Sequence, residues 1–167
     1  MIQIRPERPD DITAIRAVNV AAFGQPDEAD LVDRLRPTDG YLSLVAVLND
    51  AVVGHSAFSA MTLSPARPER TFYGLAPMAV LPDRQRRGIG SALVRAGLDA
   101  CRDAGADAVF ALGHPTYYPR FGFTPATDLG LASEYDVPRE AFMAMELRAG
   151  ALEGVLGVAQ YHPAFAM

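Results

Sequence analysis

The chain has 167 residues, of which 50% are apolar and 21% charged, which is enough apolar material for the core of one globular domain. A net charge of −5 and a pI near 5.1 argue against a general binder of nucleic acid or of membrane surfaces, which would be basic. The single cysteine, Cys101, excludes an intramolecular disulfide and argues against a cysteine-based metal site.

The single cysteine, which leaves no internal disulfide, favours a reducing compartment. Neither an apolar signal segment at the N-terminus nor a run of eighteen uncharged apolar residues occurs in the sequence. We therefore expect a soluble cytoplasmic protein that forms one domain over residues 1–167, with no membrane and no nucleic acid among its partners.

The first part of the chain alternates strand and helix patterns. Apolar residues with a period of two or of about 3.6 predict a strand at 2–4, helices over 8–23 and 26–35, and strands over 41–50 and 51–61. The two later strands meet at Asn49-Asp50, a pair typical of an antiparallel hairpin.

The second part continues the alternation. We expect a strand over 71–81, a helix over 91–105, a buried strand over 107–112, a short turn or helix over 116–121, and strands within 141–147 and 154–161. Pro77 implies a bulge or a break in pairing, and Gly105 is the expected end of the helix. No internal repeat or linker divides the chain.

The run "AVLPDRQRRGIG" at 79–90 places two glycines where a strand gives way to a helix. Backbone N–H groups at a helix N-terminus lack intrahelical partners and carry partial positive charge, so they can bind an anion. Gly88 and Gly90 leave room for a phosphate, Ser91 adds a hydroxyl, and Arg86 and Arg87 add charge. The alternative is that the glycines only permit a tight turn beside solvated arginines.

Two common phosphate motifs do not fit this turn. A Walker motif needs a lysine after its glycines, and the chain contains no lysine. A dinucleotide fingerprint needs a third glycine, but Leu93 stands at that position.

The string Gln85-x-x-Gly88-x-Gly90 resembles the acyl-coenzyme A signature Q/R-x-x-G-x-G/A of the GNAT superfamily of N-acetyltransferases. It follows "LAPMAVLP" and precedes an amphipathic helix and the strand "DAVFAL". Tyr118, four residues before Gly122-Phe123, is similar to the family's tyrosine ahead of a G-F pair. The wider run "LGHPTYYPRFGF" and the tail "GALEGVLGVAQYHPAF" resemble a bacterial subgroup of predicted acetyltransferases of the YhbS type, so the resemblance covers nearly the whole chain.

The resemblance implies an α/β (α+β) acyl-CoA N-acyltransferase fold: a mixed, mostly antiparallel sheet of about six to seven strands, splayed in the middle, with helices on both faces. It implies acetyl-CoA as cosubstrate, no metal, and a small-molecule or peptide amine as acceptor. The cofactor-binding residues that it implies are Met78, Ala79, Val80, Gln85, Arg86, Arg87, Gly88, Ile89, Gly90, Ser91 and Tyr118. Members of the family often pair, so a homodimer is compatible with it.

Tyr118 is the residue that the resemblance assigns to the leaving group. A tyrosine with a pKa near 10 is protonated at neutral pH and can donate a proton to the departing thiolate of CoA. The alternative is an aromatic packed beside Phe121 and Phe123. Tyr117 is the weaker candidate for the same role.

A general base is harder to find, because the strand over 71–81 contains no Asp or Glu. His55 is the candidate, since its ordinary pKa lies near neutrality, but a histidine inside a strand is more often a satisfied core group. Tyr73 and His114 are further candidates. An acceptor whose amine already has a low pKa would need no base.

Three functions remain open from the sequence. The leading one is an acetyl-CoA-dependent N-acetyltransferase in which an amine attacks the thioester directly in a ternary complex. The second is a non-catalytic module that binds acyl-CoA as a sensor or regulator. The third is a purely structural turn with no affinity for CoA.

Overall fold

The computed structural model describes residues 1–166, in which nine strands and three α-helices form. The strands are β1 (Gln3–Pro6), β2 (Leu42–Leu48), β3 (Ala51–Ser64), β4 (Phe72–Val80), β5 (Ala108–Leu112), β6 (Thr124–Pro125), β7 (Leu131–Ser133), β8 (Phe142–Glu146) and β9 (Gly157–Gln160). The helices are α1 (Ile12–Phe23), α2 (Asp27–Leu35) and α3 (Ile89–Asp103). The chain divides into two compact units, and β3, β4 and α3 contribute residues to both. That residues 1–167 act as one domain stays a prediction.

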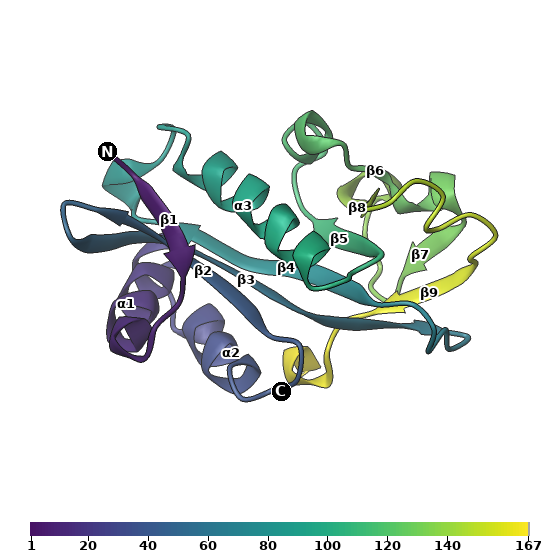
Figure 1. Cartoon of the computed structure of the whole chain (residues 1–167), viewed down its shortest axis with the longest axis horizontal. Coiled ribbons are helices and arrows are strands. Elements are labelled where there is room, and N and C mark those ends of the chain that lie inside the picture. Colours follow the sequence, from purple (N-terminus) through teal and green to yellow (C-terminus); the bar gives the residue numbers. More distant parts are fainter. Residues whose placement is uncertain (167) are drawn as a thin grey trace. The chain divides into compact units, whose positions relative to one another are not determined.

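The first unit contains residues 1–58, 76–100 and 164–166. Its strand order is β1-β2-β3-β4, with β1–β2 and β2–β3 antiparallel. Because successive side chains of a strand point to opposite faces, Leu44 and Ala46 pack with α3, whereas Val45 packs with Ile15 of α1 and Val32 of α2. Within this unit α3 therefore covers one face of the sheet, and α1 and α2 cover the other (Figure 1).

The hairpin between β2 and β3 turns at the predicted pair. Asn49 has φ 50° and Asp50 has φ 63°, so both residues adopt the left-handed conformation that a type I′ turn requires. Asparagine and aspartate tolerate this conformation better than other side chains, which explains why the sequence marks the turn.

Glycines follow the ends of α1 and α3, but α3 begins two residues earlier than predicted. α1 ends before Gly24 at φ 72°, and α3 is followed by Gly105 at φ 85°, the predicted stop. However, α3 begins at Ile89 rather than at residue 91, because Gly90 continues the helix instead of belonging to the preceding turn.

The second unit contains residues 59–75 and 101–163. β4 pairs with β5 in parallel from Phe72↔Ala108 to Leu75↔Ala111, while β5–β8 and β6–β8 are antiparallel. β9 pairs antiparallel with the end of β3 and parallel with β7. The predicted mixed, mostly antiparallel sheet is therefore confirmed. The sequence patterns missed β6 and β7, because strands of two and three residues are too short to show a period.

Candidate active site

The glycine-rich turn leaves the end of β4 through a short 3-10 segment, Pro82–Arg84. The side-chain Nε2 of Gln85 donates to the backbone oxygen of Val80 at 3.0 Å. This bond fastens the turn to the end of the strand. The side chain of Gln85 thus has a local structural partner, which the signature alone did not reveal.

Gly88 is the last residue before α3, and its conformation explains the glycine. Its φ is 81°, in the left-handed region, and a Cβ added there would meet no heavy atom within 4 Å. Backbone conformation, rather than crowding by other parts of the chain, therefore requires glycine at this position. Arg86 also has a positive φ, 63°, so the turn contains two residues in this uncommon region.

The first intrahelical bond of α3 runs from the amide of Ala92 to the oxygen of Gly88, at 3.0 Å. The amides of Ile89 and Gly90 precede this bond and therefore have no partner within the helix. Residues 85–88 are exposed. The turn thus combines backbone donors at the positive end of a helix dipole with the exposed side chains of Arg86 and Arg87, which fits a phosphate group.

The N-terminus of α3 is anchored by its own side chains. Ile89 is 4% exposed and packs with Leu93 on the sheet. Gly54 on β3 permits this approach, because a Cβ there would lie 3.1 Å from Ile89 Cγ2 and 3.1 Å from Leu93 Cδ1. The side chain of Ile89 therefore points into the core, so only its backbone can contact a ligand.

The three β4 residues that the resemblance selected lie beside the same core. Met78 and Val80 are half-buried and pack against the cluster that contains Ile89, and Ala79 is 3% exposed. The structure thus brings Met78, Ala79 and Val80 together with residues 85–91 in the first unit. Tyr118 belongs to the second unit.

His55 lies on β3 and is fully buried. The amide Nδ2 of Asn19 on α1 lies 3.1 Å from His55 Nδ1 and also donates to the oxygen of Ile15 at 3.0 Å. Because an amide nitrogen only donates, Nδ1 is the acceptor and Nε2 carries the proton. Nε2 lies 2.9 Å from Ser43 Oγ, whose hydroxyl donates to Glu7 Oε1 at 2.6 Å.

These contacts affect whether His55 is available as a general base. Burial lowers the pKa of His55 to about 4, while Glu7 raises it and Arg36 lowers it further. The imidazole is therefore neutral at pH 7, with both nitrogens engaged and no exposed surface. These observations favour the alternative, a satisfied structural histidine, over a general base. The pattern of the sequence could not identify the network, because its members come from four separate segments.

Tyr118 begins a short 3-10 segment, Tyr118–Phe121, which confirms the predicted turn or helix. Its side chain is 9% exposed, and its ring packs edge-on against Phe123 at a centroid distance of 5.5 Å and against Tyr117 at 5.2 Å. Burial raises the pKa of Tyr118 to about 12. The hydroxyl is therefore protonated over the physiological pH range, as a proton donor requires.

The other singled-out side chains show no sign of activation. Cys101 is a small buried core residue, and burial raises the pKa of its thiol to about 12, which keeps it protonated. Burial also raises the pKa of Tyr73. His114 is exposed.

Residues 1–166 contain neither a candidate metal cluster nor a helix able to span a membrane. Nowhere in this range do three or more His, Cys, Asp or Glu side chains gather as metal ligands would. Of the helices described, none is both long enough and apolar enough to cross a membrane.

The sequence was compared with known families and proteins. The model of the acetyltransferase (GNAT) family matches residues 12–123. The chain is 41% identical to the uncharacterized N-acetyltransferase YjhQ of Escherichia coli K12 over 134 residues, which cover 78% of this chain and 74% of YjhQ. It is 36% identical to the uncharacterized N-acetyltransferase YhbS of the same strain over 165 residues, 97% of each chain.

The fold was compared with solved structures. The crystal structure of YhbS from Escherichia coli in complex with CoA matches with a TM-score of 0.91 and 36% identity, covering 99% of this chain and 92% of YhbS. A GNAT family acetyltransferase from Brucella melitensis in complex with acetyl-CoA matches with a TM-score of 0.81 and 37% identity, covering 99% and 98% of the two chains. The predicted fold class and family are therefore confirmed.

Proposed function

Because the chain belongs to the acetyltransferase (GNAT) family, we propose that it transfers the acetyl group of acetyl-CoA directly to a primary amine of a small molecule or peptide, in a ternary complex. The proposal rests on the exposed turn before α3. Gly88 has φ 81° in this turn, and the amides of Ile89 and Gly90 have no hydrogen-bond partner within the helix. The similarity to proteins solved with CoA and with acetyl-CoA supports it.

The residues of the chain have distinct tasks in this proposal. The amides of the turn, with Arg86 and Arg87, hold the pyrophosphate, and backbone groups near Met78 and Val80 align the thioester. When bound, acetyl-CoA supplies an acyl group activated by a thiol leaving group. A backbone N–H of this segment stabilises the negative charge that develops on the carbonyl oxygen as the amine attacks. As the C–S bond breaks, Tyr118 donates its proton to the departing sulfur, while the nitrogen gives its extra proton to water and solvent returns a proton to the tyrosine oxygen.

The proposal assigns no general base. His55 is buried and neutral, and the strand over 71–81 has no carboxylate. A lysine-like amine with a pKa of about 10.4 is neutral in only about one molecule in 10^3.4 at pH 7, a penalty of about 4.6 kcal/mol. We therefore expect an acceptor whose amine pKa lies well below 10.4, since such an amine is partly neutral without assistance.

The lack of an Asp or Glu on the strand over 71–81 also gives the second candidate function, a non-catalytic acyl-CoA sensor. The two functions differ in turnover and not in binding. A sensor binds acetyl-CoA, modifies no amine, and is indifferent to the loss of the Tyr118 hydroxyl.

The test is a calorimetric titration of acetyl-CoA and CoA into the wild type and into a Gly88→Glu, Gly90→Glu double variant, with circular dichroism to show that both are folded. We expect binding to the wild type and loss in the variant, because two carboxylates at the turn repel a pyrophosphate. A panel of amines, with release of the CoA thiol as readout, then separates enzyme from sensor. Equal binding by the two proteins would overturn the proposed phosphate site, and binding to neither would overturn both functions.

A further inference from the structure

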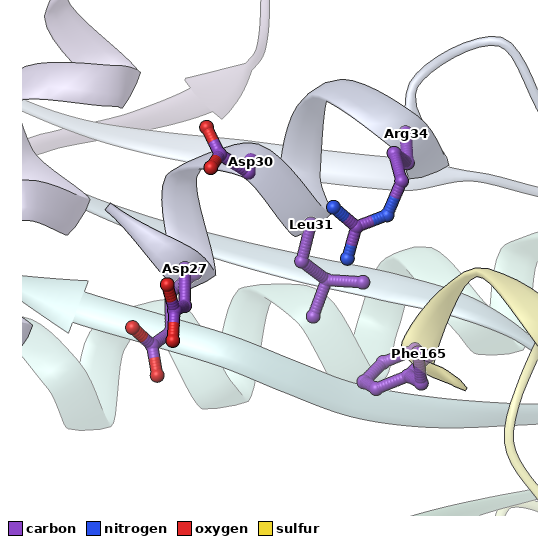
Figure 2. Close-up of a pocket in the computed structure, with 6 residues that line it drawn as sticks. Asp27, Asp30, Leu31, Arg34 and Phe165 are labelled. Carbon is purple, nitrogen blue, oxygen red and sulfur yellow. The ribbon is translucent and has the colours of Figure 1, made fainter. Parts of the chain in front are cut away.

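A pocket of about 370 Å³ lies in the first unit, between α2 and the C-terminal turn that carries Phe165 (Figure 2). Two of its charged side chains are bound within the chain, since Asp30 pairs with Arg16 at 2.7 Å and Arg34 Nε donates to the backbone oxygen of Ala164 at 3.2 Å. A contact in the second unit bears more directly on function, because it limits where the proposed proton donor can lie.

Gly113 follows β5 directly, and its backbone is held in place. Leu112↔Phe142 is the last pair of the β5–β8 ladder, and the amide of Gly113 then donates to the oxygen of Ala141 at 2.9 Å. Gly113 is not among the glycines with a positive φ, so other residues can adopt its backbone conformation. The reason for glycine at this position therefore lies in its surroundings and not in its backbone.

The ring of Tyr118 lies where a side chain at Gly113 would stand. A Cβ built on Gly113 would lie 3.0 Å from Cε2 of Tyr118, 3.8 Å from Cδ2 and 4.0 Å from Cζ. The nearest of these atoms, Cε2, is bonded to Cζ, which bears the hydroxyl. A methyl group would therefore press on the hydroxyl end of the ring, which would have to move by a few tenths of an ångström.

Other aromatic rings confine Tyr118 on its remaining sides. Its ring packs edge-on against Tyr117 at a centroid distance of 5.2 Å and against Phe123 at 5.5 Å, and Phe123 is 2% exposed. The amide of Gly122 donates to the oxygen of Pro119 at 3.0 Å, which closes the backbone turn that follows Tyr118. Because a close-packed interior has no void to take up an added group, a methyl group at Gly113 shifts the hydroxyl.

We propose that Gly113 is a positioning residue for Tyr118: the lack of a side chain lets the ring lie against the end of β5 and sets the place of its hydroxyl. The inference rests on the proposed function, in which that hydroxyl donates to the departing sulfur. Proton transfer depends steeply on the distance between donor and acceptor, so a displaced hydroxyl slows the chemical step and leaves the binding of acetyl-CoA as it is. Gly113 carries no proton-transferring group and acts only through Tyr118.

The kinetic test is a double-mutant cycle on amine acetylation with Gly113→Ala, Tyr118→Phe and the two combined. We expect Gly113→Ala to lower kcat by roughly threefold to tenfold at unchanged affinity for acetyl-CoA, since misplacing a group by about 1 Å can cost about a hundredfold. In the Tyr118→Phe background, which keeps the ring and lacks the hydroxyl, the same replacement should change kcat by less than about twofold. Thr116→Ala, at an exposed position of the same loop, is the control and should turn over as the wild type does. Unchanged kcat in Gly113→Ala, or an equal loss in both backgrounds, would overturn the proposal.

The ring itself is observed by NMR of protein that carries isotope-labelled tyrosine, and the signal of Tyr118 is the one that disappears in Tyr118→Phe. We expect this signal to shift in Gly113→Ala, because the ring moves relative to its aromatic neighbours, while the signal of Tyr41 in the first unit stays in place. Circular dichroism confirms that each variant is folded. An unmoved Tyr118 signal would overturn the proposal. If the wild type acetylates no amine, the proposed function fails, and the ring signal still decides whether Gly113 holds Tyr118 in place.

Discussion

The ring of Phe58 on β3 occupies the place of a side chain at Gly97 on α3. A Cβ built on Gly97 would lie 2.2 Å from Cε1 and 2.2 Å from Cζ of Phe58, and Phe58 is fully buried. The helix therefore lies against the ring itself. Since the N-terminus of the same helix carries the proposed phosphate site, this contact helps to set its position on the sheet.

Replacing Gly97 by alanine should destabilise the protein. Alanine is the better helix former by about 1 kcal/mol, but this severe overlap with a buried ring should cost about 2 to 3 kcal/mol, the upper part of the usual range for overpacking, so we expect a net loss of about 1 to 2 kcal/mol in the free energy of unfolding. Urea denaturation measures it.

A second replacement tests the cause. If the ring is responsible, Gly97→Ala should cost less in a Phe58→Leu background, where no ring fills the space. Equal costs in the two backgrounds, or a Gly97→Ala variant more stable than the wild type, would show that the contact does not constrain the helix.

Gly88 offers a separate test of the turn, because a control with the same backbone conformation exists. Gly24 after α1 has φ 72° and, like Gly88 at φ 81°, would place a Cβ in open space. Alanine at either position should cost about 1–2 kcal/mol of stability, the cost of the left-handed region. Only Gly88→Ala should also weaken acetyl-CoA binding, by roughly tenfold, or about 1.4 kcal/mol. Calorimetry on both variants checks this, and equal effects on affinity would remove Gly88 from the site.

The sequence predicted most of this fold because its signals are local. Asn49-Asp50 marks a turn by its own conformational preference, Gly105 marks the end of a helix, and alternating apolar residues mark the longer strands. Each signal lies within a few residues of the feature that it predicts. The short β6 and β7 carry no such signal, since they exist only through pairing with β8 and β9.

The sequence left His55 open between a general base and a satisfied core histidine, because the signals that would decide are not local. Its partners Asn19 and Ser43 are distant in sequence, and nothing local indicates that the ring is enclosed. Only the folded chain shows that the ring nitrogen suited to accept a proton already accepts a hydrogen bond from the side-chain amide of Asn19. The residue type thus left catalysis open, and the packing of the folded chain favours the structural alternative.

His55 should make stability depend on pH. An unfolded histidine has a pKa of about 6.5, whereas burial lowers the folded pKa of His55 to about 4, so between these values the unfolded state binds more protons. The contribution is present above pH about 6.5 and is lost as pH falls toward 4, by roughly 3 kcal/mol.

Carboxylates also titrate there, so the measurement is the difference between the wild type and His55→Gln in urea denaturation from pH 4.5 to 7.5. His114→Gln, at an exposed position, controls for the loss of an imidazole. Parallel curves for wild type and His55→Gln would contradict the buried neutral ring.

Tyr118 gives the sharpest test of the chemistry. Phenylalanine keeps the ring that packs against Phe123 and Tyr117 and removes only the hydroxyl, so the fold and the affinity for acetyl-CoA should not change. If the hydroxyl donates to the departing sulfur, kcat for amine acetylation should fall by roughly tenfold to a hundredfold, toward the lower end of general acid effects because a thiolate is a good leaving group.

The pH profile of the same variant tests the raised pKa of the proposed donor. Burial raises the pKa of Tyr118 to about 12, so the hydroxyl stays protonated well above pH 9, and the defect of Tyr118→Phe should be the same at pH 7 and pH 9. Tyr117→Phe is the matched control, since it removes a neighbouring hydroxyl from the same segment and should retain turnover. A Tyr118→Phe variant that acetylates amines at the wild-type rate would exclude the hydroxyl from the reaction, because the proton would then reach the sulfur from water.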